Sequence, residues 1–270
     1  MTGRLLVIGM ISAGIANICN AQVAGRSLIT ETMLHPGDAS TAYTFTKGEL
    51  SYQQAITPYP NWAWWGITDW LTAELDFEAW LGGVPSFNFR FRLRRQMGAI
   101  PALAFETMFQ YVNDEFDQFE NLEFLEIRRQ GVNWYHHLNA SWNVASRWHL
   151  HLSAGFTYGE KLHIGNNHEE IPVARSLDKF IEPDIAFGID WRAEHWLTII
   201  ASGSYGSTFI YADNIARKQQ FSLATRVAPF IESKRDFWNS FRFELALIHV
   251  YFSDAQERFA GPIGFIYWQW

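Results

Sequence analysis

The chain has 270 residues, a formal net charge of −7 at pH 7 and a single cysteine, Cys19. The negative charge argues against a nucleic-acid partner, which would require a basic face. A single cysteine near the start excludes a disulfide framework, and it leaves the rest of the chain without a thiol nucleophile or a thiolate metal site.

Residues 1–21 have the layout of a cleaved secretory signal peptide. A basic residue, Arg4, precedes an apolar run, and a small residue, Ala21, ends the segment. The run is too short to span a bilayer comfortably, and no later run reaches the roughly 18 apolar residues that a membrane helix needs. We therefore expect an exported protein without helical spans, in which residues 22–40 form a short polar lead-in to a single domain, residues 41–270.

Aromatic residues make up 17% of the chain, with 13 Trp, yet the mean hydropathy is only −0.12. Alternation along β-strands explains both values, because one half of each strand can face lipid while the other half stays polar. Alternating segments separated by turn-like stretches predict twelve strands. We expect them at residues 42–55, 61–68, 70–80, 87–95, 101–112, 122–144, 148–159, 179–191, 196–211, 218–230, 239–252 and 261–270.

The connections between these segments alternate between short turns and long loops, as they do in outer-membrane barrels, where the short turns face the periplasm. We therefore predict an all-β fold: a transmembrane antiparallel up-and-down β-barrel of about twelve strands. A secreted soluble β-sandwich is the alternative. It would bury its aromatic face against a second sheet, and it would not need this alternation of connections.

The chain ends in GFIYWQW, which places Ile266, Trp268 and Trp270 on one face. This ending resembles the terminal strand of bacterial outer-membrane β-barrel proteins, whose last aromatic residue is part of the assembly signal. The resemblance implies a location in the bacterial outer membrane. It also implies contact with membrane lipid and lipopolysaccharide, and insertion by the barrel-assembly machinery.

Residues 87–95, FNFRFRLRR, alternate apolar and mostly basic side chains, so one face of this strand carries guanidinium groups. In a membrane barrel the aromatic face meets lipid and the arginines point into the lumen. Acidic residues alternate in the same way on other strands and can pair with arginines across the sheet. The predicted lumen charge ladder sets Glu78 opposite Arg90, Asp76 opposite Arg92, Glu74 opposite Arg94, Glu106 beside Arg90, and Arg226 against Glu244.

Such a ladder neutralises the lumen wall and narrows the bore. It serves either as a packed polar interior or as a charged constriction that selects solutes, and both roles fit rings of this kind. On the expected ninth strand, small residues face inward and leave room opposite the Arg90 side. They are Thr198, Ser202, Ser204, Gly206 and Thr208.

A second set of inward polar residues follows the sixth, seventh and eighth strands. We expect the tight turn to bring Ser141 near His151 and Asn143 near His149, with Asp190 close to His149. Polar clusters in a lumen usually bond to each other and to water, so we expect neither a metal site nor a cofactor. This lumen polar patch comprises His137, Asn139, His149, His151 and Asp190.

The spacing of His151 and Ser153 resembles the His-x-Ser spacing of two outer-membrane lipid hydrolases, the phospholipase A type and the lipid A deacylase type. That resemblance implies catalytic roles for these two residues, and Ser141 is a further candidate nucleophile. In those families the pair faces the membrane near the outer leaflet, and an Asn or Gly commonly follows the Ser. Here the pair lies close to a periplasmic turn and Ala154 follows it. Of the groups that a serine nucleophile needs, the sequence supplies a base and an orienting acid but no oxyanion site.

The expected function is a passive pore or small-solute channel with a charged, partly narrowed lumen. The alternatives are a lipid hydrolase of the kind just described and a plugged barrel that binds a partner through its loops.

Overall fold

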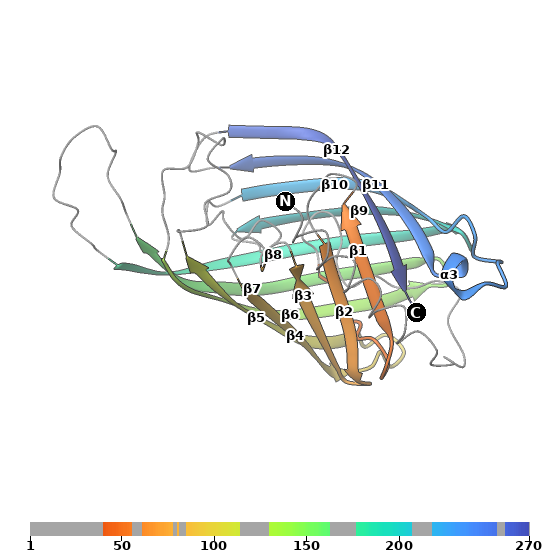
Figure 1. Cartoon of the computed structure of the whole chain (residues 1–270), viewed down its shortest axis with the longest axis horizontal. Helices are drawn as coiled ribbons and strands as arrows, with labels where there is room; N and C mark the ends of the chain where they lie inside the picture. The colour runs from red at the N-terminus through yellow and green to blue at the C-terminus, as the bar shows by residue number, and fades with distance from the viewer. Residues whose placement is uncertain are drawn as a thin grey trace, which may run out of the picture.

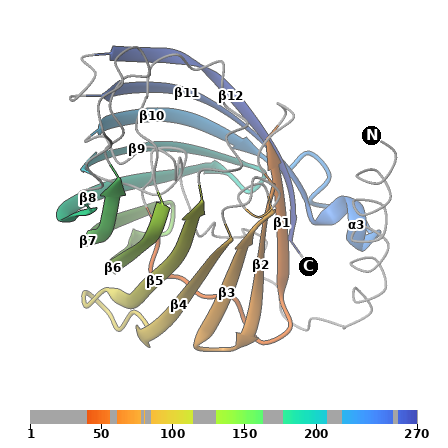
Figure 2. The same ribbon diagram turned by 60° about the vertical axis from the view of Figure 1, so that its left-hand side comes forward.

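The computed structural model describes residues 40–55, 61–77, 80, 85–113, 130–162, 177–206, 218–252 and 257–269. Within this part of the chain, twelve strands close into one antiparallel barrel in which sequence neighbours pair and β1 pairs with β12 (Figures 1 and 2). The predicted all-β up-and-down barrel is therefore confirmed. The strands are β1 (Leu50–Ala55), β2 (Asn61–Thr68), β3 (Leu71–Asp76), β4 (Ser86–Arg94), β5 (Ala102–Asn113), β6 (Gln130–Ala145), β7 (Trp148–Leu162), β8 (Leu177–Glu194), β9 (Leu197–Gly206), β10 (Lys218–Val227), β11 (Phe241–Phe252) and β12 (Glu257–Gln269).

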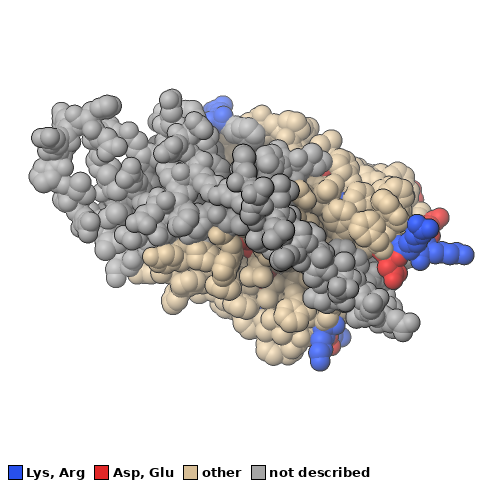
Figure 3. All heavy atoms as spheres, viewed as in Figure 1, with Lys and Arg blue, Asp and Glu red and all other residues tan. Residues whose placement is uncertain are grey.

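The strands turn their apolar side chains outward and their polar side chains inward. On β8, Ile185, Phe187 and Ile189 are between 37% and 50% exposed, whereas Asp184 and Asp190 on the other face are at most 8% exposed. On the face drawn in Figure 3, most of the described surface consists of residues other than Lys, Arg, Asp and Glu. This distribution is the reverse of that in a soluble barrel, and it suits a wall that meets lipid.

Short turns join the strands at one end of the barrel, and the C-terminal strand finishes there (Figure 1). They include residues 69–70, 146–147 and 195–196. Strands β5 and β7 end, and β6 and β8 begin, at the opposite end of the barrel, because neighbouring strands run antiparallel.

Aromatic side chains cluster outside the barrel at the short-turn end. The connection from β10 to β11 contains the short helix α3 (Asp236–Asn239). Phe237 and Phe241 pack beside Trp268, with ring centroids 5.6 Å and 5.3 Å away. Aromatic residues of this kind prefer the boundary between membrane and water. None of the described helices has the length and apolarity needed to cross a membrane.

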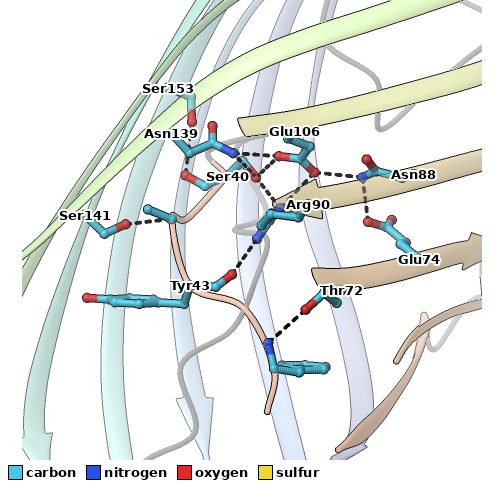
Figure 4. A network of polar contacts seen from close by, with 12 residues as sticks. Ser40, Tyr43, Thr72, Glu74, Asn88, Arg90, Glu106, Asn139, Ser141 and Ser153 are labelled. Carbon is cyan, nitrogen blue, oxygen red and sulfur yellow. Dashed lines mark hydrogen bonds and ion pairs between the residues drawn. The ribbon is translucent and has the colours of Figure 1, made fainter. Parts of the chain in front are cut away.

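The first expected strand, residues 42–55, is wrong in its N-terminal half. The wall strand β1 begins only at Leu50, and residues 40–45, here called the inner segment, contact side chains that point into the barrel (Figure 4). The pattern TAYTF alternates like a strand. The N–H groups of Ala42 and Phe45, however, bond to side chains of the wall.

The chain turns from the inner segment into β1 beside β2. Gly66 exchanges backbone hydrogen bonds with Gly48 and Glu49, each 2.8 Å long. A Cβ atom at Gly66 would lie 1.9 Å from the carbonyl oxygen of Thr46. Only glycine therefore permits this close passage of the chain over β2.

Candidate functional site: the barrel interior

The most heavily bonded group in the interior is the carboxylate of Glu106 on β5 (Figure 4). Arg90 Nη2 donates to Glu106 Oε1 at 2.8 Å, and the two side chains are 2% and 1% exposed. Asn88 Nδ2 donates to the same oxygen at 2.7 Å, and Asn139 Nδ2 donates to Oε2 at 2.7 Å. Asn88 also donates to Glu74 at 2.8 Å. Each oxygen of Glu106 is therefore bonded, as a buried charge requires.

The lumen charge ladder differs from the predicted one between β3 and β4. Arg90 lies opposite Thr72, and Glu74 lies opposite Asn88. The predicted Glu74–Arg94 register is therefore wrong. Strand β3 ends at Asp76 and β4 begins at Ser86, and their register differs by several residues from the one predicted by folding about GGVPS. Glu78 lies outside the described residues.

The other two arginines of this strand lie toward the short-turn end. Phe91 is opposite Leu71, the first residue of β3, so Arg92 lies beyond the start of β3 and does not face Asp76 at its end. Arg94 donates from Nε and Nη2 to the carbonyl of Pro101, at 3.3 Å each. Of the three predicted arginines, only Arg90 therefore joins the buried network around Glu106.

A second buried ion pair joins β10 and β11. Arg226 lies directly opposite Glu244 in the register, as the sequence pattern indicates. Nε and Nη2 of Arg226 lie 2.7 Å and 2.6 Å from Glu244 Oε2. The guanidinium carbon is also 5.4 Å from the ring centroid of Tyr267 on β12. The two ion pairs lie on separate parts of the wall, one on β4–β5 and one on β10–β11.

The histidines of the polar patch bond to inward partners on neighbouring strands. His137 Nε2 lies 2.6 Å from Asp184 Oδ1, and both side chains are almost fully buried. Asp184 was not singled out from the sequence, although its place on the polar face of an alternating strand is a usable signal. His149 Nδ1 lies 3.0 Å from the hydroxyl of Tyr43 in the inner segment.

Ser141, His151 and Asp190 form a line across β6, β7 and β8. Ser141 Oγ lies 2.8 Å from His151 Nδ1, and His151 Nε2 lies 3.6 Å from Asp190 Oδ2. Ser153, the serine of the His-x-Ser spacing, instead donates to the carbonyl of Ser40 at 3.0 Å. Ser141 is 0% exposed and accepts a hydrogen bond from the N–H of Ala42. The inner segment therefore covers this serine.

Apolar side chains also face inward, and none of them was among the predicted lumen residues. Trp62 and Trp64 on β2 pack with Phe45 and with Phe265 on β12 in one buried cluster. A second cluster lines β9, β10 and β11. It consists of Ile200, Ala224, Ala246, Ile248 and Val250.

Small inward residues occupy the wall beside these clusters. Thr198, Ser202, Ser204 and Gly206 on β9 are buried as expected, while Thr208 lies outside the described residues. Ser202 Oγ lies 2.7 Å from Ser222 Oγ on β10. Among the described residues, no group of three or more His, Cys, Asp or Glu side chains has an arrangement that could hold a metal ion.

Of the predicted assembly signal, Ile266 and Trp268 belong to β12, and Trp270 lies outside the described residues. Trp268 pairs with Tyr52 and Phe241 in the strand register and stacks on Tyr52 at a centroid distance of 6.4 Å.

No protein-family model matches this sequence, and no curated protein matches it. Among solved structures, the chain is similar to that of the NanC porin. The two share 5% sequence identity with a TM-score of 0.43, over 81% of this chain and 97% of the porin chain.

Proposed function

We propose that this protein is an outer-membrane channel for small polar solutes, with a bore narrowed on the side of β3 to β8. The observation that carries the proposal is the inverted barrel: an apolar exterior around an interior lined by bonded polar and charged groups. Residues 1–21 supply an export signal, and the aromatic ending supplies an assembly signal. The short-turn end then faces the periplasm.

The passage runs along β9 to β11, away from the network around Glu106. Several inward side chains there are small, with Ser202, Ser204 and Ser222 beside Ala224 and Ala246. Larger inward side chains on the same strands are Ile200, Ile248 and Val250 and the Arg226–Glu244 pair. Small side chains leave more of the bore open than the long side chains of Arg90 and Glu106 do. Two of the buried arginines, Arg90 and Arg226, each lie against a glutamate. These two pairs therefore add little net charge to the wall and should discriminate only weakly between cations and anions.

Conductance measurement tests this proposal. The chain is refolded in detergent and shown to be folded by heat-modifiable migration on a gel, then added to planar lipid bilayers. Stepwise, ohmic conductance is the expected result. Folded barrels that insert but stay silent under all voltages and salt concentrations would overturn the proposal.

A second candidate function is hydrolysis by Ser141, favoured by its 2.8 Å contact with His151 and by the nearby carboxylate of Asp190. A lumenal serine cannot reach the acyl chains of lipids outside the wall, so its substrate would be a small soluble ester. Incubation with a fluorophosphonate probe, followed by mass spectrometry, tests this function. Modification of Ser141 that His151→Ala abolishes would support it, and an unmodified serine would remove it.

A further inference from the structure

Backbone groups of the inner segment bond to the barrel wall (Figure 4). Hydroxyl groups on β3, β6 and β7 bond to the N–H and carbonyl groups of this segment. The pairs are Ala42 N–H with Ser141 Oγ (2.8 Å), Phe45 N–H with Thr72 Oγ1 (2.9 Å) and Ser40 O with Ser153 Oγ (3.0 Å). Every peptide has these backbone groups. The inner wall can therefore bind the backbone of an extended peptide whatever its side chains.

Side chains of the inner segment determine its register along the wall. The hydroxyl of Ser40 donates to Glu106 Oε2 at 2.6 Å and accepts from Arg90 Nη2. The hydroxyl of Tyr43 lies 3.0 Å from His149 Nδ1, and its carbonyl accepts from Arg90 Nη1 at 3.4 Å. A peptide with a hydroxyl group at its first position and a phenol three residues later fits this wall.

The side chains of the wall also form hydrogen bonds with one another, and these bonds do not involve the inner segment. Glu106 still has Arg90, Asn88 and Asn139 as partners, and Ser141 still has His151. No salt bridge between the inner segment and the wall is present among the described residues. Release breaks hydrogen bonds, which water can replace, and it also separates Phe45 from Trp62, Trp64 and Phe265. The wall is therefore a preformed site.

The chain has a fixed turn directly after the inner segment. The N–H and hydroxyl of Thr46 bond to Glu49 Oε2 at 3.0 Å and 3.1 Å. Gly48 has φ +86°, a conformation that favours glycine, and Gly66 permits close contact with Thr46. This turn can stay in place beside β2 while the preceding residues leave the wall.

We propose that the inner wall formed by β3 to β7 is a binding site for an extended peptide, which the chain fills with its own residues 40–45. In the bound state the inner segment occupies part of the bore, and its release widens the passage along β9 to β11. The widening rests on the proposed channel function, whereas the peptide site itself does not.

Thiol labelling tests the peptide site without any measurement of transport. The probe position is Ala42→Cys, which replaces a side chain that is 1% exposed, in a full chain that also carries Cys19→Ser. A water-soluble maleimide should label it slowly. Adding Ser141→Ala and Ser153→Ala removes two wall partners and should raise the labelling rate about tenfold or more. The matched control adds Ser204→Ala and Ser222→Ala, two inward serines of β9 and β10, and should leave the rate unchanged.

A reversible cross-link tests the widening. Ala42→Cys with Ser141→Cys, again with Cys19→Ser, should form a disulfide, because the N–H of Ala42 bonds to Ser141 Oγ and the Ala42 side chain packs with Ala102, which lies opposite Ser141. In bilayers the oxidised barrel should show one small conductance level, and reductant should add larger levels. Ala42→Cys alone is the control and should not respond to reductant.

The outcomes separate the two ideas. A labelling rate that the wall substitutions leave unchanged would overturn the peptide site. If labelling accelerates while oxidised and reduced barrels conduct equally, the site stands and the widening is wrong. If labelling accelerates but no barrel conducts, the site stands and the channel function fails, together with the widening.

Discussion

The hydroxyl of Ser40 lies 2.6 Å from the carboxylate of Glu106, across 66 residues of sequence and inside the barrel. This contact joins the start of the described chain to the buried ion pair of the wall. It is also one bond among several, since Arg90, Asn88 and Asn139 bind the same carboxylate. The inner segment and the ion pair should therefore make very different contributions to stability.

Ser40→Ala removes a hydroxyl that donates to Glu106 and accepts from Arg90 and Asn139. Because these three residues keep their bonds to one another, the substitution should lower the free energy of unfolding by only about 1 to 2 kcal/mol. Glu106→Gln leaves Arg90 buried without its counter-charge and should cost about 3 to 5 kcal/mol. Urea unfolding of the refolded barrel, followed by its shift on unheated gels, measures both. Adding Arg90→Met to Glu106→Gln should recover part of the loss. A Glu106→Gln barrel as stable as the Ser40→Ala barrel would contradict the burial of this ion pair.

The second ion pair should set the ion selectivity of the passage. Arg226→Gln uncovers the carboxylate of Glu244 and should shift conduction toward cations, while Glu244→Gln should shift it toward anions. The reversal potential across a KCl gradient measures the shift, with Gln219→Glu on the outward face of β10 as a charge control. Equal reversal potentials in both variants would mean that ions do not pass this pair.

Much of the wall could be predicted from the sequence, because alternation is a local property. The inward faces of β6, β7 and β8 follow it, and so Ser141 and His151 lie opposite each other as expected. The register of β3 against β4 could not be predicted in this way. It depends on the length of the connection after Asp76, and alternation is unchanged when a strand slides by an even number of residues.

The position of the inner segment inside the barrel could not be predicted from the sequence for a related reason. Thr41, Tyr43 and Phe45 alternate with Ala42 and Thr44, as residues of a wall strand do. Whether such a segment joins the sheet or lies inside it depends on hydroxyl groups such as Thr72 and Ser153, which are distant in sequence. The inward position of Trp62 and Trp64 is likewise set by contact with Phe45 and not by local pattern.

The aromatic end of the chain should act during assembly. Deleting Trp270 should lower the amount of folded protein in the outer membrane of cells much more than Trp270→Phe does, because the resemblance to terminal strands of outer-membrane barrels implies recognition of an aromatic residue there. Immunoblots of unheated membrane samples measure the folded fraction. Equal yields of the two variants would show that assembly does not depend on this residue.

Two adjacent residues of β10 offer the sharpest test of which face meets lipid. Phe221 is 53% exposed on the outer wall, and Ser222 is 7% exposed on the inner wall. An arginine on the lipid face costs about 2 to 4 kcal/mol near the bilayer midplane, whereas lumen substitutions mainly tune selectivity. Phe221→Arg should therefore reduce the fraction that folds into lipid vesicles far more than Ser222→Arg does. In detergent micelles, which adapt their shape around a charge, the difference should shrink. If Ser222→Arg is instead the variant that fails in vesicles, the inner and outer faces are exchanged and the lumen wall described above is wrong.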